Sequence, residues 1–150
     1  MEQAVAVSSN ERNLAALAHA SILVGMFTSG VGGILVALVI WLTQKEKSAY
    51  VAFQALQALV YQVAVFLVTM LAWCCWGLLW MALLFLPLLT NPEAYETGVP
   101  PGLWAGLCLM IIPLAIWGLT LLYGLWGGVR CLSGHDFKYA LVGGWLEKQP

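Results

Sequence analysis

The chain has 150 residues, of which 62% are hydrophobic and only 9% are charged, and its formal net charge is -1. Soluble domains carry roughly 25% charged residues, so these few charged side chains cannot cover a water-exposed fold of this size. The near-neutral charge, with no basic cluster, also argues against nucleic acid as a partner. We therefore expect a membrane protein that is surrounded by lipid.

Three long stretches of the chain carry no charged residue, namely residues 13–44, 48–92 and 97–129. Each stretch exceeds the ~20 residues that a helix needs to cross the hydrocarbon core. None shows the alternating polar and apolar pattern of a barrel strand, and helices are then the structure that satisfies the backbone inside lipid. This predicts an all-α polytopic four-helix bundle that forms a single integral membrane domain over residues 1–150.

The first stretch is too long for one perpendicular helix and has a glycine-rich middle, Phe27 to Gly33, where a helix is expected to end and restart. Ser8 and Glu11 fit a capping box. We predict a first helix over about residues 10–26 and a second over about 33–44, together a short hairpin. The sequence leaves open whether this hairpin fully spans the membrane or is re-entrant.

The third predicted helix is long, from about 48 to 86, with Ser48 as its N-cap and Pro87 near its end. The fourth runs from about 103 to 132 and should be kinked at Pro113, because proline removes a backbone hydrogen bond from the helix interior. Trp residues near the predicted membrane boundaries are typical of interfacial belts; they are Trp41, Trp104, Trp126 and Trp145.

The segment from His135 to Pro150 is predicted to be a short amphiphilic C-terminal tail. Its apolar residues, expected at the membrane interface, are Phe137, Tyr139, Leu141 and Trp145. Its charged residues, expected in water, are Lys138, Glu147 and Lys148.

Cationic residues flank the predicted helices at what we expect to be one membrane face: Arg12, Lys45, Lys47, Arg130, Lys138 and Lys148. The connection between the third and fourth helices instead carries Glu93 and Glu96. Because Lys and Arg favour the cytoplasmic side, we expect both termini in the cytoplasm and a multi-pass protein of the bacterial inner membrane.

Several segments together resemble a bacterial family of small membrane proteins of unknown function. That family is itself similar to the twenty-kilodalton channel component of the chloroplast inner-envelope protein-import translocon. The resemblance implies a four-helix membrane bundle with cytoplasmic termini. It rests on Glu11 to His19, Gly33 to Leu42, Lys45 to Lys47, Val51 to Leu59, Gln62, Gly134 and Phe137 to Tyr139.

His19 is the histidine that falls within a predicted membrane segment, and Gln54, Gln57 and Gln62 lie roughly on one side of the third helix. We expect a neutral imidazole hydrogen-bonded to one of these glutamines, as an intramembrane polar cluster that holds helices together. A proton-linked role or a ligand contact for His19, and a polar conduit along the glutamines, are the functional alternatives.

Trp73, Trp76 and Trp80 follow i, i+3, i+7 spacing and form an aromatic stripe. Helix packing or lipid contact is the simplest explanation, and a pigment, quinone or haem pocket is the alternative; no histidine stands near the stripe in sequence to ligate haem. The pairs Gly102/Gly106 and Gly124/Gly128 permit close helix approach.

The cysteines, Cys74, Cys75, Cys108 and Cys131, lack metal-site or disulfide-framework spacing and are expected to be reduced. The sequence predicts no catalytic, metal or cofactor site, and hence no enzyme. We expect a non-enzymatic accessory or assembly subunit that packs against other membrane proteins or forms a homo-oligomer. An oligomeric transport or protein-translocation channel component is the alternative.

Overall fold

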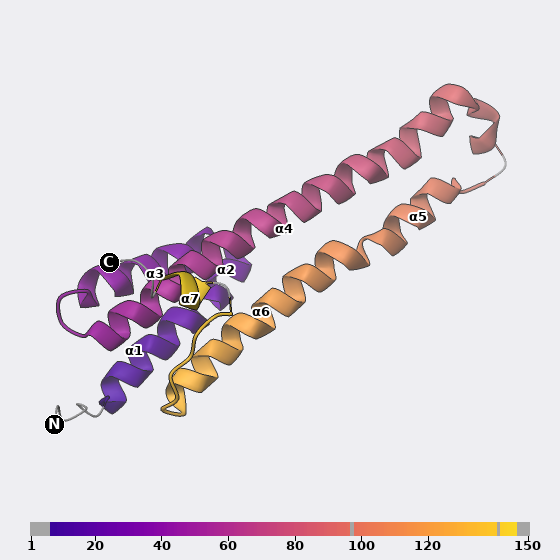
Figure 1. Cartoon of the computed structure of the whole chain (residues 1–150). Coiled ribbons are helices and arrows are strands. Elements are labelled where there is room, and N and C mark those ends of the chain that lie inside the picture. Colours follow the sequence, from indigo (N-terminus) through magenta and orange to yellow (C-terminus); the bar gives the residue numbers. More distant parts are fainter. Residues whose placement is uncertain (1–6, 97, 141, 147–150) are drawn as a thin grey trace. The chain divides into compact units, whose positions relative to one another are not determined.

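A computed structural model describes residues 7–96, 98–140 and 142–146, and every regular element in this part of the chain is a helix (Figure 1). The chain groups into two compact units. The first unit comprises Met1–Phe66 together with Thr120–Pro150, and the second comprises Leu67–Leu119. The all-helical prediction is confirmed for the described residues.

The first predicted helix is present as two pieces, α1 (Ser9–Ala20) and α2 (Ile22–Phe27). The capping box is confirmed, because the Ser8 side chain accepts a hydrogen bond from the Glu11 N–H while the Glu11 carboxylate accepts one from the Ser8 N–H. The prediction of one continuous helix over 10–26 is wrong at Ser21. The Ser21 hydroxyl donates to the carbonyls of Ala18 and Gly33, and such back-bonding bends helices.

The chain turns between α2 and α3 (Val31–Gln44), as the glycine-rich segment predicts. Gly30 has φ +91°, a conformation that favours glycine. α3 packs against α1 and α2, and Gly33 permits this, because a Cβ there would lie 2.7 Å from the Ser21 carbonyl oxygen. α3 begins two residues before the predicted start at residue 33.

α4 (Ala49–Thr90) begins at the predicted place, and Ser48 accepts a hydrogen bond from the Val51 N–H as its N-cap. The predicted end at residue 86 is wrong, because Pro87 lies inside the helix. Proline at this position removes the hydrogen bond to the Leu83 carbonyl. The helix still closes its last turn, where the Asn91 N–H donates to the Pro87 carbonyl.

A short 3-10 helix, η1 (Pro92–Tyr95), leads to α5 (Pro101–Leu109) and α6 (Ile111–Leu132). The single helix predicted over 103–132 therefore begins two residues earlier and is divided at Met110. The division lies just before Pro113, whose ring cannot donate to the Leu109 carbonyl, so the interruption expected near this proline is present.

Within the described ranges, two helical stretches are long and apolar enough to cross a membrane: Ala49–Thr90, with mean hydropathy 2.1, and Pro101–Leu132, with mean hydropathy 2.2. In the second unit, residues 67–90 of α4 reach about 36 Å at 1.5 Å per residue, against a hydrocarbon core of ~30 Å. α5 runs beside this part of α4 (Figure 1). The second unit is thus a helical hairpin of membrane-spanning length.

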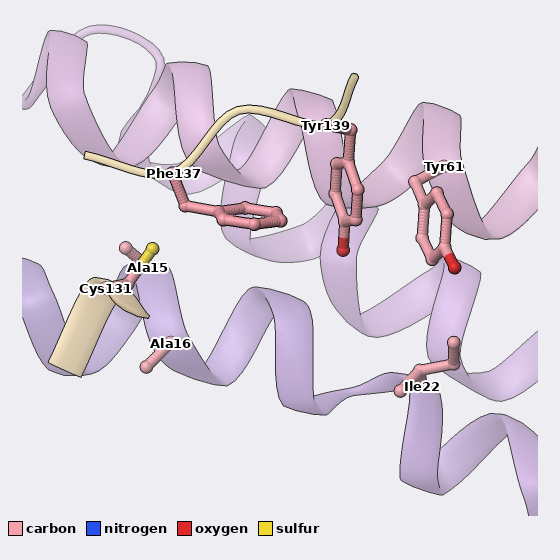
Figure 2. Packing of buried hydrophobic residues seen from close by; sticks show 7 residues of the cluster. All are labelled: Ala15, Ala16, Ile22, Tyr61, Cys131, Phe137 and Tyr139. Carbon is pink, nitrogen blue, oxygen red and sulfur yellow. The ribbon is translucent and has the colours of Figure 1, made fainter. Parts of the chain in front are cut away.

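The segment after α6 turns at Gly134 (φ +75°) and passes through residues 135–140 without regular structure before α7 (Val142–Leu146). Phe137 and Tyr139 are buried in the core of the first unit (Figure 2). These two rings therefore face the protein interior and not the interfacial lipid expected for them. The interface expected for Leu141 and the Trp145 side chain, and the water expected for Glu147 and Lys148, fall outside the described residues.

Candidate functional site

Buried polar side chains gather on one face of α4 in the first unit. Gln54, Gln57 and Gln62 are all buried, and small residues such as Ala55 and Ala58 lie on the helix between them. A buried amide needs partners for both its donor and its acceptor. The partners of Gln54 and Gln57 come from α1 and from the segment Phe137–Tyr139.

Gln57 binds the backbone of this segment through both ends of its amide. Its Nε2 donates to the Phe137 carbonyl at 3.2 Å, and its Oε1 accepts from the Tyr139 N–H at 3.2 Å. In an extended chain the carbonyl of one residue and the N–H two residues later point to the same side. The Gln57 side chain thus pairs with the segment as a neighbouring strand would.

Gln54 links the same carbonyl to His19. Its Nε2 donates to the Phe137 carbonyl at 3.1 Å, and its Oε1 lies 3.1 Å from His19 Nε2. The Phe137 carbonyl accepts only, which fixes the orientation of the Gln54 amide and leaves its oxygen toward the ring. His19 Nε2 must then carry the hydrogen and donate it to Gln54.

The other His19 nitrogen, Nδ1, lies 2.9 Å from the Tyr139 hydroxyl. Burial raises the pKa of Tyr139, so this hydroxyl keeps its proton and can donate it. In the neutral ring, Nδ1 accepts that hydrogen bond while Nε2 donates to Gln54. Both nitrogens of an imidazole that is 1% exposed are therefore paired within the chain.

Aromatic contacts complete this site. The Tyr139 ring stacks on Tyr61 with centroids 4.0 Å apart and an interplanar angle of 8°, and Phe137 meets His19 edge to face at 5.6 Å. Figure 2 shows the Tyr61 and Tyr139 rings side by side. We name the group His19, Gln54, Gln57 and Tyr61, which holds residues 137–139, the tail clasp.

Gln62 contributes to a different contact from the one predicted for it. Its Nε2 donates to the Ala18 carbonyl at 3.2 Å and to the Ser21 hydroxyl at 2.9 Å. These are the groups at the division between α1 and α2. The four residues predicted as one polar cluster therefore serve two neighbouring contacts: the tail clasp, and the joint at Ser21.

The tryptophan stripe lies in the second unit and contacts α5. Trp73 and Trp76 are 5.4 Å apart and perpendicular, and Trp76 and Trp80 are 5.0 Å apart. Trp76 Nε1 donates to the Gly106 carbonyl at 2.9 Å. The Trp80 ring occupies the space that a Cβ at Gly106 would need.

Both glycine pairs lie at helix contacts within the chain. Gly102 faces the Leu83 carbonyl, the group that Pro87 leaves without its helical donor, and a Cβ on Gly102 would clash with it. In the first unit, a Cβ on Gly128 would lie 3.2 Å from the Ala16 carbonyl oxygen, and one on Gly124 would lie 3.0 Å from Ile22. The pairs therefore allow α4 to meet α5, and the α1–α2 segment to meet α6.

An apolar groove of about 550 Å³ runs between α1 and α6 in the first unit. Ala16, Ala20 and Gly128 line it together with larger apolar side chains such as Leu17 and Leu125. Its volume falls within the ~300–1,000 Å³ of ligand pockets. The surface of the groove is almost entirely apolar. Such a surface suits an acyl chain or the apolar side chains of a partner helix.

Among the described residues, no group of three or more His, Cys, Asp or Glu is arranged to hold a metal ion. Cys74, Cys75 and Cys108 are exposed and Cys131 is buried, all as free thiols. The hydrogen bonds of the tail clasp and of the joint at Ser21 hold separate segments of the chain together.

Sequence reasoning missed Phe137, Tyr139 and Ser21 as partners of the polar face. An available signal was the Phe-Lys-Tyr alternation after Gly134, since alternating aromatic residues are typical of an extended segment with one buried side. A partner segment 82 residues away from Gln57 leaves no periodic trace in the helix itself.

Residues 10–146 match the model of the magnetosome magnetite crystal formation protein family. The chain belongs to this family. This membership agrees with the prediction of a small bacterial membrane protein. The family, however, is one of magnetosome membrane proteins, whereas the sequence patterns indicated a family of unknown function. The comparisons give no support to the likeness to the plastid translocon component. No curated protein and no solved structure matches the chain.

Proposed function

We propose that this magnetosome family member is a non-enzymatic integral membrane subunit that supports magnetite crystal formation by packing against partner membrane proteins or further copies of itself. Its family is named for magnetite crystal formation. Its two long apolar helical stretches support a place in the membrane. The magnetosome membrane is accordingly the compartment we propose.

One contrast carries this proposal: the polar side chains of the tail clasp pair inside the chain, whereas large apolar side chains are exposed on the outside. Both His19 nitrogens and the amides of Gln54 and Gln57 have internal partners. Large apolar residues of α1 and α6, such as Leu17 and Leu122, are exposed. A surface of this kind favours contact with lipid or with apolar faces of other proteins.

We further propose a multi-pass topology in which both termini face the cytoplasm and Glu93 and Glu96 lie on the other side. The supporting pattern is the placement of the cations, since Lys and Arg favour the cytoplasmic face. The helical segments would then act as one integral membrane domain. Cysteine labelling that placed the Glu93 connection on the same side as Lys45 would contradict this topology.

The partner role is tested by purification from native membranes in mild detergent, after cross-linking in intact cells. We expect the chain to migrate as a complex and to be cross-linked to specific neighbouring proteins. In a separate experiment, we expect deletion of its gene to alter the size or number of magnetite crystals in electron micrographs. A lone monomer with no captured neighbour would refute the packing role. Unchanged crystals would refute the link to mineral formation.

An oligomeric transport or protein-translocation channel is the second candidate, prompted by the glutamine face of α4. Such a role needs an open polar path. In the first unit, residues 137–139 occupy Gln54 and Gln57, and for this reason we propose the packing role first. Solute flux or conductance in vesicles that contain the oligomer would favour the channel.

A further inference from the structure

The chain from the start of α1 to the end of α3 forms a hairpin whose two ends lie close together in the first unit. The Ser48 hydroxyl, just before α4, donates to the Glu11 carboxylate at the start of α1 at 2.6 Å. Arg12, Lys45 and Lys47 belong to the same two chain ends. The two ends of the hairpin therefore lie together, and their cations are suited to lipid phosphates.

The returning arm is too short to cross a bilayer. α3 has 14 residues, which reach about 21 Å at 1.5 Å per residue, whereas the hydrocarbon core measures ~30 Å. Lys45 Nζ lies 5.9 Å from the centroid of the Trp41 ring. A lysine beside a tryptophan is typical of the headgroup level, which places the end of α3 at the membrane surface.

The tip of the hairpin, between α2 and α3, is apolar and exposed. Phe27 is 87% exposed, and Val24, Met26 and Val31 around it are exposed as well. Water is an unfavourable solvent for such a cluster. Acyl chains would remove this apolar cluster from water.

Several polar groups at this tip are paired within the hairpin. The Thr28 hydroxyl donates to the Val24 carbonyl at 2.8 Å and accepts from the Gly32 N–H at 2.9 Å. The Gly30 N–H donates to the Gly25 carbonyl at 2.7 Å, and the Val31 N–H donates to the Thr28 carbonyl. Hydrocarbon requires that backbone groups be paired within the protein, and these bonds meet that requirement for the N–H groups of Gly30, Val31 and Gly32.

We propose that the α2–α3 hairpin is a re-entrant lipid anchor, whose Phe27 tip enters the acyl chains of the leaflet nearest Lys45 and returns without crossing the membrane. Lipid acyl chains surround the tip. The proposal rests on the chain being a membrane protein and is independent of any partner that the subunit binds.

Single-cysteine variants of the full chain in sealed membrane vesicles test this proposal. In a background where all four cysteines (Cys74, Cys75, Cys108 and Cys131) are replaced by alanine, Phe27→Cys reports on the tip, and Lys47→Cys and Glu96→Cys mark the two membrane faces. A membrane-impermeant maleimide is applied from each side. A bimane label on Phe27→Cys, attached in detergent, is then quenched by lipids carrying nitroxides at different depths.

We expect Lys47→Cys and Glu96→Cys to be labelled from opposite sides, and Phe27→Cys from neither, although it reacts fully in detergent. The bimane should be quenched most by nitroxides on the acyl chains. Labelling of Phe27→Cys from the Glu96 side would show a crossing, and labelling from the Lys47 side would show a tip in water. Weak quenching at all depths, or protection that persists in detergent, would show a tip covered by protein. Each of these three results overturns the proposal, and none bears on whether partner proteins co-purify.

Discussion

Gln57 and Tyr139 are joined by a hydrogen bond across 82 residues of sequence, from the Tyr139 N–H to Gln57 Oε1 at 3.2 Å. The same amide binds the Phe137 carbonyl through Nε2. One side chain therefore replaces the backbone partners that this segment would have in a sheet. It ties the residues that follow α6 to the buried face of α4.

The change Gln57→Leu should release this segment. Leucine has a similar size but leaves the buried Tyr139 N–H without an acceptor, which costs about 1–3 kcal/mol. We expect a lower free energy of unfolding in detergent and faster tryptic cleavage after Lys138. Gln44→Leu, a half-buried glutamine at the end of α3, is the matched control. Equal cleavage rates in the two variants would contradict the role given to Gln57.

Tyr139→Phe should isolate the hydroxyl contact with His19. The change keeps a ring that can stack on Tyr61 but removes the donor to Nδ1, at a cost of about 1 kcal/mol. Nitrogen NMR in nanodiscs should show the neutral His19 ring protonated at Nε2, with the Nδ1 signal shifted in the variant. A His135→Gln background removes the second histidine signal. A ring protonated at Nδ1 in the unmodified chain would refute the assigned hydrogen-bond directions.

Gly106→Leu should disrupt the contact between α4 and α5, because its side chain would occupy the place of the Trp80 ring. Overpacking of this kind costs about 1–3 kcal/mol. The control is Gly118→Leu in the same unit, where a Cβ meets nothing within 4 Å. Thermal unfolding monitored by tryptophan fluorescence should show a loss for the first variant only. Similar losses for both would contradict the packing.

The contact between Glu11 and Ser48 should make stability depend on pH. Hydrogen bonds from the Ser48 hydroxyl, and then from Ser8, lower the pKa of Glu11 below its ordinary value of 4.5. Because the folded pKa is the lower one, the stabilisation is present above that value and is lost as the pH falls through the folded pKa. Glu11→Gln should therefore unfold at a lower temperature than the unmodified chain at pH 7, and the difference should shrink as the pH falls through the folded pKa of Glu11.

Ser133→Ala controls for general effects of acid, since the Ser133 hydroxyl donates to the Val129 carbonyl instead of a carboxylate. Its difference from the unmodified chain should stay constant between pH 7 and pH 3. A constant difference for Glu11→Gln over the same range would contradict the assigned pKa direction.

The elements that sequence patterns predicted well are those fixed by local chemistry. The capping box at Ser8, the turn at Gly30 and the N-cap at Ser48 each depend on residues within a few positions of one another, and all are present. The errors came from contacts across the fold. Ser21 interrupts a helix because its hydroxyl reaches Gly33, and α4 passes Pro87 although proline usually ends helices.

In the candidate site, too, the locally determined features could be predicted and the contacts across the fold could not. The glutamine face of α4 follows from helical periodicity, and a buried histidine needs partners on general grounds. The choice of Phe137 and Tyr139 as those partners depends on how α6 and the following segment fold back onto α4. Their aromatic character suited a membrane interface equally well, so composition alone could not decide between the two positions.

The internal use of both glycine pairs affects how association experiments on this protein should be interpreted. Bulky substitutions at Gly102 or Gly106 are a common way to search for a dimer interface between membrane helices. Here they would first damage the fold of a single protomer, because both glycines contact α4 of the same chain. Loss of an oligomer in such a variant would therefore say nothing about which surface the subunits share, unless the monomer's own integrity had been measured beforehand.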